Sequence, residues 1–473
     1  MSVETPRERI SRDEWVGLAA ACALAALLRW PSMTRGLGYD ELFTMTKFVD
    51  VDAWRTVSTY LDFNNHVAYS LSAKLAVALL GRSEWAIRLP AFVLGIGGVA
   101  ATWWLGRTMA GGVVGVLAAG LLAISPPHVL WSVSARGYTG MILCSTVATV
   151  AFLRWRTWRS PWTTAYVAAS GLGAWFHLFG LMVTLSHALL AVAEWRRHSV
   201  GRTLLPPFLP VSVAAGGLTV LLHAPLLPGL FNSLRRTAGG SFAPLFPHLV
   251  VDELLGHVGS LPELILSAFV GVGWWWLARH NRRHGWLLGI SLLAPLLIGW
   301  VARPIDLFAR FYVYWLPLLC IALATGLCVP SAALAGVRRR VAMVLSGAAM
   351  VMAATLWVAR SGSIAVDEGF RAAAISAAEG LPASSLLCGL GGGAELFQFY
   401  LPDRPAERLV VPESLADFQR QARRVDEIRC LYRPVSWEPR YHTEIAKLVG
   451  DRGSSTQFSA VVLLRAPSRQ IFP

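Results

Sequence analysis

Charged side chains are scarce in this sequence. Of its 473 residues, 15% are Asp, Glu, Lys or Arg and 55% are apolar, whereas a soluble globular protein carries about a quarter charged residues. The mean hydropathy is +0.51. This balance excludes a disordered chain, a collagen and a coiled coil, and it argues against a cytosolic enzyme. It predicts a polytopic membrane protein, and the 20 Trp residues agree, because Trp gathers at membrane interfaces.

Several signatures of catalysis are also missing. The sequence has no Walker A motif, no nucleophile elbow, no HExxH motif and no Cys or His spacing typical of a metal site, so we assign no metal ligands. Six Cys are present, four of them in apolar runs, where a thiol is usually a small hydrophobic side chain. Cys388 and Cys430 lie in the C-terminal part. They can form a disulfide if that part is extracytoplasmic, and the sequence leaves this pairing open.

The charges are unevenly distributed. Residues 1–360 hold 29 Lys and Arg against 15 Asp and Glu, which accounts for the whole net charge of +14, whereas residues 361–473 hold 13 of each kind. This shift predicts a transmembrane domain over 1–360 and a soluble domain over 361–473. No basic stripe is interleaved with aromatic residues, so we expect no nucleic-acid partner.

Apolar runs of a length that suits membrane crossing predict about eleven transmembrane helices. They fall at 15–30, 88–106, 111–126, 138–155, 162–178, 179–195, 205–225, 262–278, 286–302, 311–329 and 341–358. A shorter run, Val67–Leu80, contains Lys74 and predicts an interfacial or partly embedded helix.

Arginine clusters precede the first run and recur at every second connection, which marks these loops as cytoplasmic. The N-terminus is then cytoplasmic, and eleven crossings place the C-terminal domain outside a cell (inner or plasma) membrane. No acid falls in the middle of a predicted span, which weakens the case for an ion-coupled transporter.

The sequence of the C-terminal domain alternates strand and helix patterns and so predicts an α/β fold. Strands are expected at Ser384–Leu390, Arg408–Val411, Ile428–Tyr432 and Phe458–Leu464, and helices at Phe370–Glu379, Ala394–Tyr400 and Ser414–Arg424.

Two polar segments follow the first predicted span. Asp40 and Glu41 come after a Gly-rich turn, where a carboxylate can act as general base or bind a divalent cation. The alternative, equally favoured by the spacing, is a capped helix over Leu42–Val49 with solvated acids. Asn65, His66 and Tyr69 supply hydrogen-bonding groups for a sugar-like polyol, or else cap a helix and anchor it at the interface.

Arginines and a histidine follow on the same predicted membrane face. Arg136, two residues before Tyr138, suits an anionic lipid headgroup or phosphate, although a snorkelling Arg is common there. Arg303 and Arg310 lie beside aromatic residues in a later segment on that face. His177 sits in a very short outer loop, where packing is favoured over a role in an outer cavity.

These segments together resemble the GT-C glycosyltransferases, in particular the family 39-like group of protein O-mannosyltransferases and aminoarabinose transferases. The resemblance covers roughly residues 15–330 and rests on short segments that occur in order. They are Asp40-Glu41, Asn65-His66, Ser83–Pro90 with Arg88, Ala135–Tyr138, Trp175–Gly180 and Ala309–Tyr312.

The resemblance implies a GT-C-like fold and transfer of a sugar from a polyprenyl-phosphate donor, with inversion, on the extracytoplasmic face. It implies Asp40 as the catalytic base with Glu41 beside it. It suggests that Arg136, Tyr138 and Arg310 lie near the donor phosphate and that His66 lies near the sugar or the acceptor. We expect further substrate contacts from Asn65, Tyr69, Arg88, His177 and Tyr312. The Pro that often follows this His in the family is absent here, and no second pair of acids marks a metal site. A divalent cation is therefore left open, with no other cofactor expected.

The acceptor is expected to be a lipid, a glycan or a protein. The protein itself is expected to contact membrane lipids. A rival from another class is a lipid or lipid-linked sugar transporter (flippase), in which the same arginines bind headgroups and no base is needed. A scaffold with an interaction tail is the third possibility.

Overall fold

The computed structural model describes residues 9–60, 65–155, 157–198, 207–237, 260–302, 309–333, 354–359, 368–391, 394–401, 409–434 and 440–471, with four single positions besides. The chain forms two compact units. The first contains Met1–Met33, Ala53–Gly81 and Ala86–Ala365, and the second contains Thr34–Asp52, Arg82–Trp85 and Val366–Pro473. The second unit thus includes two short segments that precede residue 100, which the sequence placed in the transmembrane domain.

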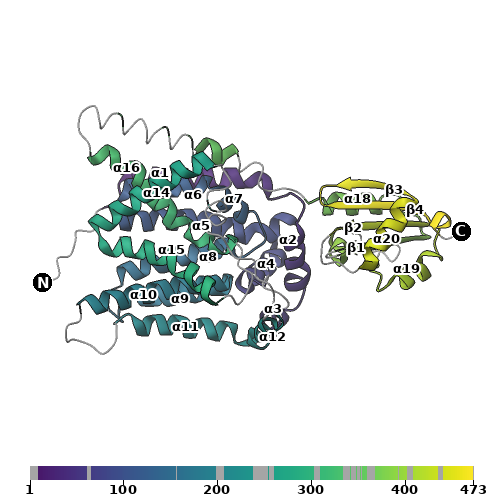
Figure 1. The fold of residues 1–473 in the computed structure, drawn as a ribbon, viewed down its shortest axis with the longest axis horizontal. Helices are drawn as coiled ribbons and strands as arrows, with labels where there is room; N and C mark the ends of the chain where they lie inside the picture. The colour runs from purple at the N-terminus through teal and green to yellow at the C-terminus, as the bar shows by residue number, and fades with distance from the viewer. Residues whose placement is uncertain are drawn as a thin grey trace. The chain divides into compact units, whose positions relative to one another are not determined.

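The first unit is helical (Figure 1). Its α-helices are α1 (Arg12–Arg29), α3 (Ala53–Ser58), α4 (Val67–Leu80), α5 (Glu84–Ala110), α6 (Gly112–Ile124), α7 (Pro126–Ser132), α8 (Tyr138–Arg154), α9 (Pro161–Phe176), α10 (Leu181–His198), α11 (Leu209–His223), α12 (Leu227–Thr237), α14 (Ser260–His280), α15 (Arg282–Ala302) and α16 (Leu316–Ala333). Short 3-10 turns are η1 (Trp30–Ser32), η3 (Leu178–Gly180), η4 (Ala224–Leu226) and η5 (Ala309–Trp315).

The described part of the chain contains six helices long and apolar enough to cross a membrane. A seventh span results if α6 and α7, which are bent by 65° at Ser125, are counted as one. The multi-pass character is therefore clear, but the predicted count of eleven is not confirmed. Helices do form at the first ten predicted runs, although α8 and α9 have only 17 and 16 residues, fewer than the roughly 20 that a perpendicular span needs. The eleventh run, 341–358, lies almost entirely outside the described residues.

Helices of the first unit approach one another at small residues. A side chain on Gly273 of α14 would overlap the carbonyl of Ala322 on α16, and one on Gly326 of α16 would overlap the carbonyl of Phe269 on α14. The two helices therefore touch backbone to backbone, as small residues allow in membrane proteins.

The second unit contains a four-stranded sheet with the order β1-β2-β4-β3. Its strands are β1 (Ser385–Gly391), β2 (Glu427–Arg433), β3 (Ser454–Phe458) and β4 (Val461–Pro467), and only β1 and β2 pair in parallel. Its helical segments are α2 (Tyr39–Thr44), η2 (Met45–Val49), α18 (Phe370–Ala378), η6 (Ala394–Tyr400), α19 (Leu415–Ala422), α20 (Arg440–Asp451) and α21 (Ser468–Ile471).

The predicted α/β character of this part is thus present, with two differences. The single strand expected at Phe458–Leu464 is a hairpin, because the chain turns at Ser459, whose φ is +49°. In the segment expected as a strand at Arg408–Val411, the described part makes one isolated bridge, from Val410 to Cys388.

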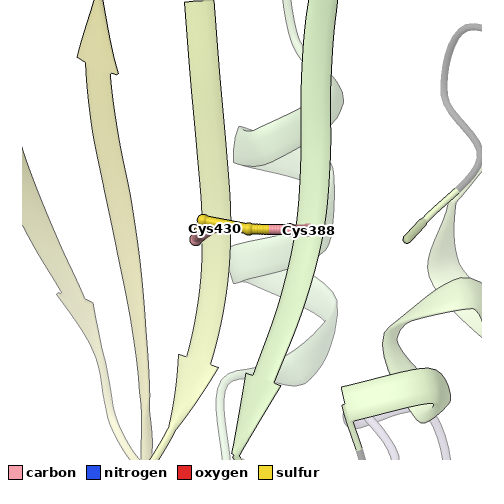
Figure 2. The surroundings of a disulfide bond; sticks show 2 residues. All are labelled: Cys388 and Cys430. Carbon is pink, nitrogen blue, oxygen red and sulfur yellow. A yellow bond between two sulfur atoms is a disulfide. The ribbon is translucent and has the colours of Figure 1, made fainter. Parts of the chain in front are cut away.

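Cys388 of β1 and Cys430 of β2 form a disulfide (Figure 2). The two residues are direct partners in the parallel register, and both are fully buried in the core of the sheet with Phe418 and Ile445. The pairing that the sequence left open is therefore made in this fold.

Candidate functional site

A cluster of aromatic and basic side chains forms where four segments of the first unit meet. The rings of His66, Tyr138 and His177 lie 5.0–5.3 Å apart, centre to centre. The guanidinium of Arg136 lies 5.7 Å from the ring centre of Tyr138, and Phe311 packs at 5.0 Å against His177. Four segments far apart in the sequence thus contribute to one place, which we call the His–Arg cluster.

Gly137 explains how these loops come so close. A side chain at this position would overlap the carbonyl of Phe176 at the end of α9, and it would approach the Cβ of His66 to 3.0 Å. Because glycine has no Cβ, the turn before α8 can press against both segments. That approach brings Arg136 and Tyr138 beside the two histidines.

His66 is held in a defined tautomer. It is 2% exposed, and its Nδ1 lies 2.9 Å from the carbonyl oxygen of Phe176, which only accepts hydrogen bonds. Nδ1 therefore carries the proton, and Nε2 presents a lone pair. Among the described residues, buried Nε2 has no hydrogen-bond partner. A group that donates a hydrogen bond, such as a sugar hydroxyl, is the ligand that satisfies it.

The electrostatic potential at His66 is positive. Burial is the largest cause that lowers its pKa well below 6.5, and electrostatic interactions with Arg136, His177 and Arg310 lower it further, opposed by the hydrogen bond to the Phe176 carbonyl. The imidazole is therefore neutral at physiological pH. A site that combines arginines with neutral hydrogen-bonding rings suits an anion attached to a polyol.

His177 is packed and also faces the arginines of the cluster. Its Nδ1 accepts a hydrogen bond from the backbone N–H of Phe179 at 3.2 Å, so in the neutral ring Nε2 carries the proton. Tyr312 is fully buried, and its ring lies 5.7 Å from that of Phe179. Its hydroxyl has no hydrogen-bond partner within the described chain. Arg303 lies outside the described residues.

Three of the predicted substrate contacts are engaged in holding the fold. The Asn65 amide donates to the carbonyl of Thr59 at 2.8 Å, and the Tyr69 hydroxyl donates to the carbonyl of Ile87. Arg88 is fully buried and donates to the carbonyl of Met33 at 3.2 Å. These bonds tie α4 and α5 to neighbouring segments of the chain.

The two adjacent acids lie on α2, in the second unit, and have different environments. Glu41 is 4% exposed, accepts a hydrogen bond from the N–H of Gly38 at 3.0 Å and pairs with Arg35 at 3.7 Å. It caps the first turn of the helix, but it is buried, whereas the alternative expected solvated acids. Asp40 is half-buried on the same first turn. The helical segment runs from Tyr39 through Val49 and so includes the expected 42–49.

Two residues near α2 were missed at the sequence level. Glu368 accepts a hydrogen bond from the N–H of Tyr39 at 3.3 Å, and Arg433 pairs with Glu368 at 3.4 Å. Burial, opposed by Arg433 and the Tyr39 bond, raises the pKa of Glu368, and Asp40 and Glu41 raise it further. In the sequence Glu368 is one acid among many in the C-terminal part, so no spacing relates it to Asp40.

Within the described residues, no group of three or more His, Cys, Asp or Glu side chains is placed to hold a metal ion.

A family model of dolichyl-phosphate-mannose-protein mannosyltransferases matches residues 67–222, which include Tyr69, Arg136, Tyr138 and His177. The fold is similar to that of ArnT from Cupriavidus metallidurans in the apo state, with a TM-score of 0.63 and 15% identity over 98% of this chain and 99% of that one. The predicted resemblance to the GT-C glycosyltransferases is confirmed. A comparison with curated protein sequences finds no match.

Two further structures of similar fold are of ligand complexes. ArnT from the same organism bound to undecaprenyl phosphate matches with a TM-score of 0.58 at 15% identity, over 96% of this chain and 98% of that one. The oligosaccharyltransferase AglB from Archaeoglobus fulgidus, in complex with an inhibitory peptide and a dolichol-phosphate, matches with a TM-score of 0.52 at 12% identity, over 89% and 69%. At these identities the likeness shows a shared fold.

The first unit also contains an apolar cavity of about 660 Å³ between α10, α14 and α15. Arg197 and Arg282 line it together with Trp274 and Trp286. Arg197 is near the C-terminal end of α10, whereas His177 precedes its N-terminal end. At 1.5 Å per residue these ends are about 27 Å apart, so the cavity is distinct from the His–Arg cluster.

Proposed function

We propose that this protein transfers a sugar from a polyprenyl-phosphate donor to an acceptor hydroxyl on the extracytoplasmic face of the membrane. The observation that carries the proposal is the His–Arg cluster within a GT-C fold. It offers cations for a phosphate and hydrogen-bonding groups for a sugar in one buried place. The undecaprenyl phosphate of ArnT and the dolichol-phosphate of AglB support this donor class.

The proposed reaction is a single displacement at the anomeric carbon. The acceptor oxygen forms a bond to that carbon while the bond from carbon to the phosphate oxygen breaks, and the electron pair leaves with the polyprenyl phosphate. Attack from the face opposite the leaving group inverts the anomeric centre. Asp40 takes the proton of the acceptor hydroxyl, as a general base does.

In this reaction the leaving phosphate gains negative charge. Arg136 and Arg310 stabilise this charge. Electrostatic stabilisation of developing charge is usually the largest single contribution to catalysis. His66, through the lone pair on Nε2, accepts a hydrogen bond from a sugar hydroxyl. The arginines supply the charge that a divalent cation supplies elsewhere, so we expect activity to survive a chelator. The sugar and the acceptor stay open.

Purified protein with labelled polyprenyl-phosphate sugars tests the proposal. We expect Asp40→Asn to reduce transfer by about 10²–10⁴-fold, because it removes the general base, while donor binding is retained. Asp50→Asn is the matched control, since Asp50 belongs to the same segment and pairs with Arg82 at 2.8 Å. Full transfer activity in Asp40→Asn would exclude Asp40 as the base.

The flippase alternative has one observation in its favour. The cavity beside Arg197 and Arg282 gives a second arginine-lined place at the other end of α10, and a transporter needs headgroup sites toward both faces. Vesicles containing the protein and a fluorescent polyprenyl-phosphate sugar separate the two. Lipid movement that persists in Asp40→Asn, with no transfer product from the unsubstituted protein, favours the transporter.

A further inference from the structure

The second unit is built partly from the segment that carries the proposed base. Thr34–Asp52 and Val366–Pro473 belong to one compact unit. The Leu37 N–H donates to the hydroxyl of Tyr400 on η6 at 2.6 Å. Arg371 on α18 donates to the carbonyl of Thr34 at 3.1 Å and pairs with Glu84 at 3.0 Å. The C-terminal part thus holds both ends of the turn that precedes α2.

The start of α2 is held by a second set of contacts. One Glu368 oxygen accepts from the N–H of Tyr39, the residue before Asp40, and the other pairs with Arg433. The guanidinium of Arg433 also lies 4.6 Å from the ring centre of Tyr39. A Cβ at Gly38 would stand 2.7 Å from the Glu368 carboxylate, so glycine is needed for this close approach.

Glu368 and Arg433 are both anchored to the sheet of the second unit. The backbone carbonyl of Glu368 accepts from the N–H of Ala460 in the turn between β3 and β4. Arg433 is the last residue of β2, paired in register with Gly391 of β1. The disulfide between Cys388 and Cys430 joins these same two strands. The sheet therefore holds the two residues whose side chains contact Tyr39, Glu368 at its backbone N–H and Arg433 at its ring.

We propose that Glu368, oriented by Arg433, is a positioning residue that holds the first turn of α2 and so sets the orientation of Asp40. The proposal rests on the proposed role of Asp40 as the base. It gives the C-terminal part a role in the reaction, because a general base must be held within hydrogen-bonding reach of the proton it takes.

Hydrogen exchange on the full-length protein tests the positioning without any activity. In Glu368→Ala, the amides of residues 37–45 should exchange faster than in the unsubstituted protein, because the acceptor for Tyr39 is lost. Glu368→Gln should exchange at an intermediate rate, since its amide oxygen still accepts that bond while the ion pair to Arg433 is gone. Glu427→Gln is the control, because Glu427 pairs with Arg429 at the opposite end of the same strand. Unchanged exchange at 37–45 in Glu368→Ala would overturn the proposal.

Kinetics test whether the positioning reaches the reaction. A misplaced base costs up to about 100-fold in rate, so Glu368→Ala should lower kcat strongly while KM for the donor changes little. In an Asp40→Asn background the same substitution should have no further effect, because it acts through Asp40. A further loss in that background, or a fall in melting temperature with kcat intact, would contradict the positioning role.

The two failures are distinguishable. If the unsubstituted protein transfers no sugar, the proposed function fails. The exchange measurement still shows whether Glu368 holds the first turn of α2. If transfer occurs and Glu368→Ala leaves both exchange and kcat unchanged, only the positioning role fails.

Discussion

At the scale of single residues, neighbouring side chains of the same kind do different things. Successive residues on a helix point about 100° apart, so Asp40 and Glu41 face different directions. Glu41 turns inward to cap its helix and meet Arg35, whereas Asp40 stays half-buried. A sequence cannot separate these two outcomes, because both follow from an acid at the start of a helix.

His66 gives a pH prediction at this scale. Its pKa is lowered in the folded protein, first by burial and then by Arg136. Below pH 6.5, His66 is protonated in the unfolded chain but stays neutral in the folded protein. The folded protein therefore loses stability as the pH falls. The expected loss is about 1.4 kcal/mol for each pH unit below 6.5, until the folded pKa is reached.

The melting temperature, followed from pH 7.5 to pH 5, checks this loss. His66→Gln should show a shallower dependence, because Gln cannot be protonated, yet its amide still donates to the carbonyl of Phe176. His280→Gln is the control, since His280 is exposed at the end of α14. Equal slopes in His66→Gln and the unsubstituted protein would show that His66 is not the group concerned.

At the scale of elements, apolar length predicted the helices well, because burial in lipid demands long apolar runs. Short and polar elements were predicted less well. The hairpin of β3 and β4 turns at Ser459, a residue with no strong turn signature, so one strand was expected where two exist. The bonds that occupy Asn65, Tyr69 and Arg88 reach backbone carbonyls of other segments, which no residue pattern marks.

The crossing of α14 and α16 gives a prediction at this scale. Gly273→Ala puts a methyl group against the Ala322 carbonyl, so the helices must separate, at a cost of about 1–3 kcal/mol for overpacking. Gly271→Ala is the matched control two residues away, because nothing lies within 4 Å of its added methyl group. Thermal unfolding in detergent compares them. A Gly273→Ala variant as stable as Gly271→Ala would show that the two backbones are not in contact.

At the scale of the whole molecule, the composition predicts one domain boundary near Arg360, but the compact units of the structure have different boundaries. The segment 34–52 is joined to the C-terminal sheet by contacts spanning more than 300 positions, such as that from Leu37 to Tyr400. Hydropathy and local periodicity carry no information about such distant pairs. The sequence therefore predicted the motif around Asp40 but not the residues that hold it.

The orientation in the membrane is the prediction that belongs to this scale. The arginine-rich connections predict that the N-terminus is in the cytoplasm, and the disulfide of the C-terminal unit favours an oxidising compartment. We expect a cysteine introduced as Ser454→Cys, on an exposed strand, to react with a membrane-impermeant maleimide in intact cells. One introduced as Arg9→Cys, at an exposed position before α1, should react only after permeabilisation. Cys388 and Cys430 should become reactive only after reduction and unfolding. If Ser454→Cys were protected until permeabilisation, the C-terminal unit, and Asp40 with it, would face the cytoplasm, and sugar transfer on the outer face would be excluded.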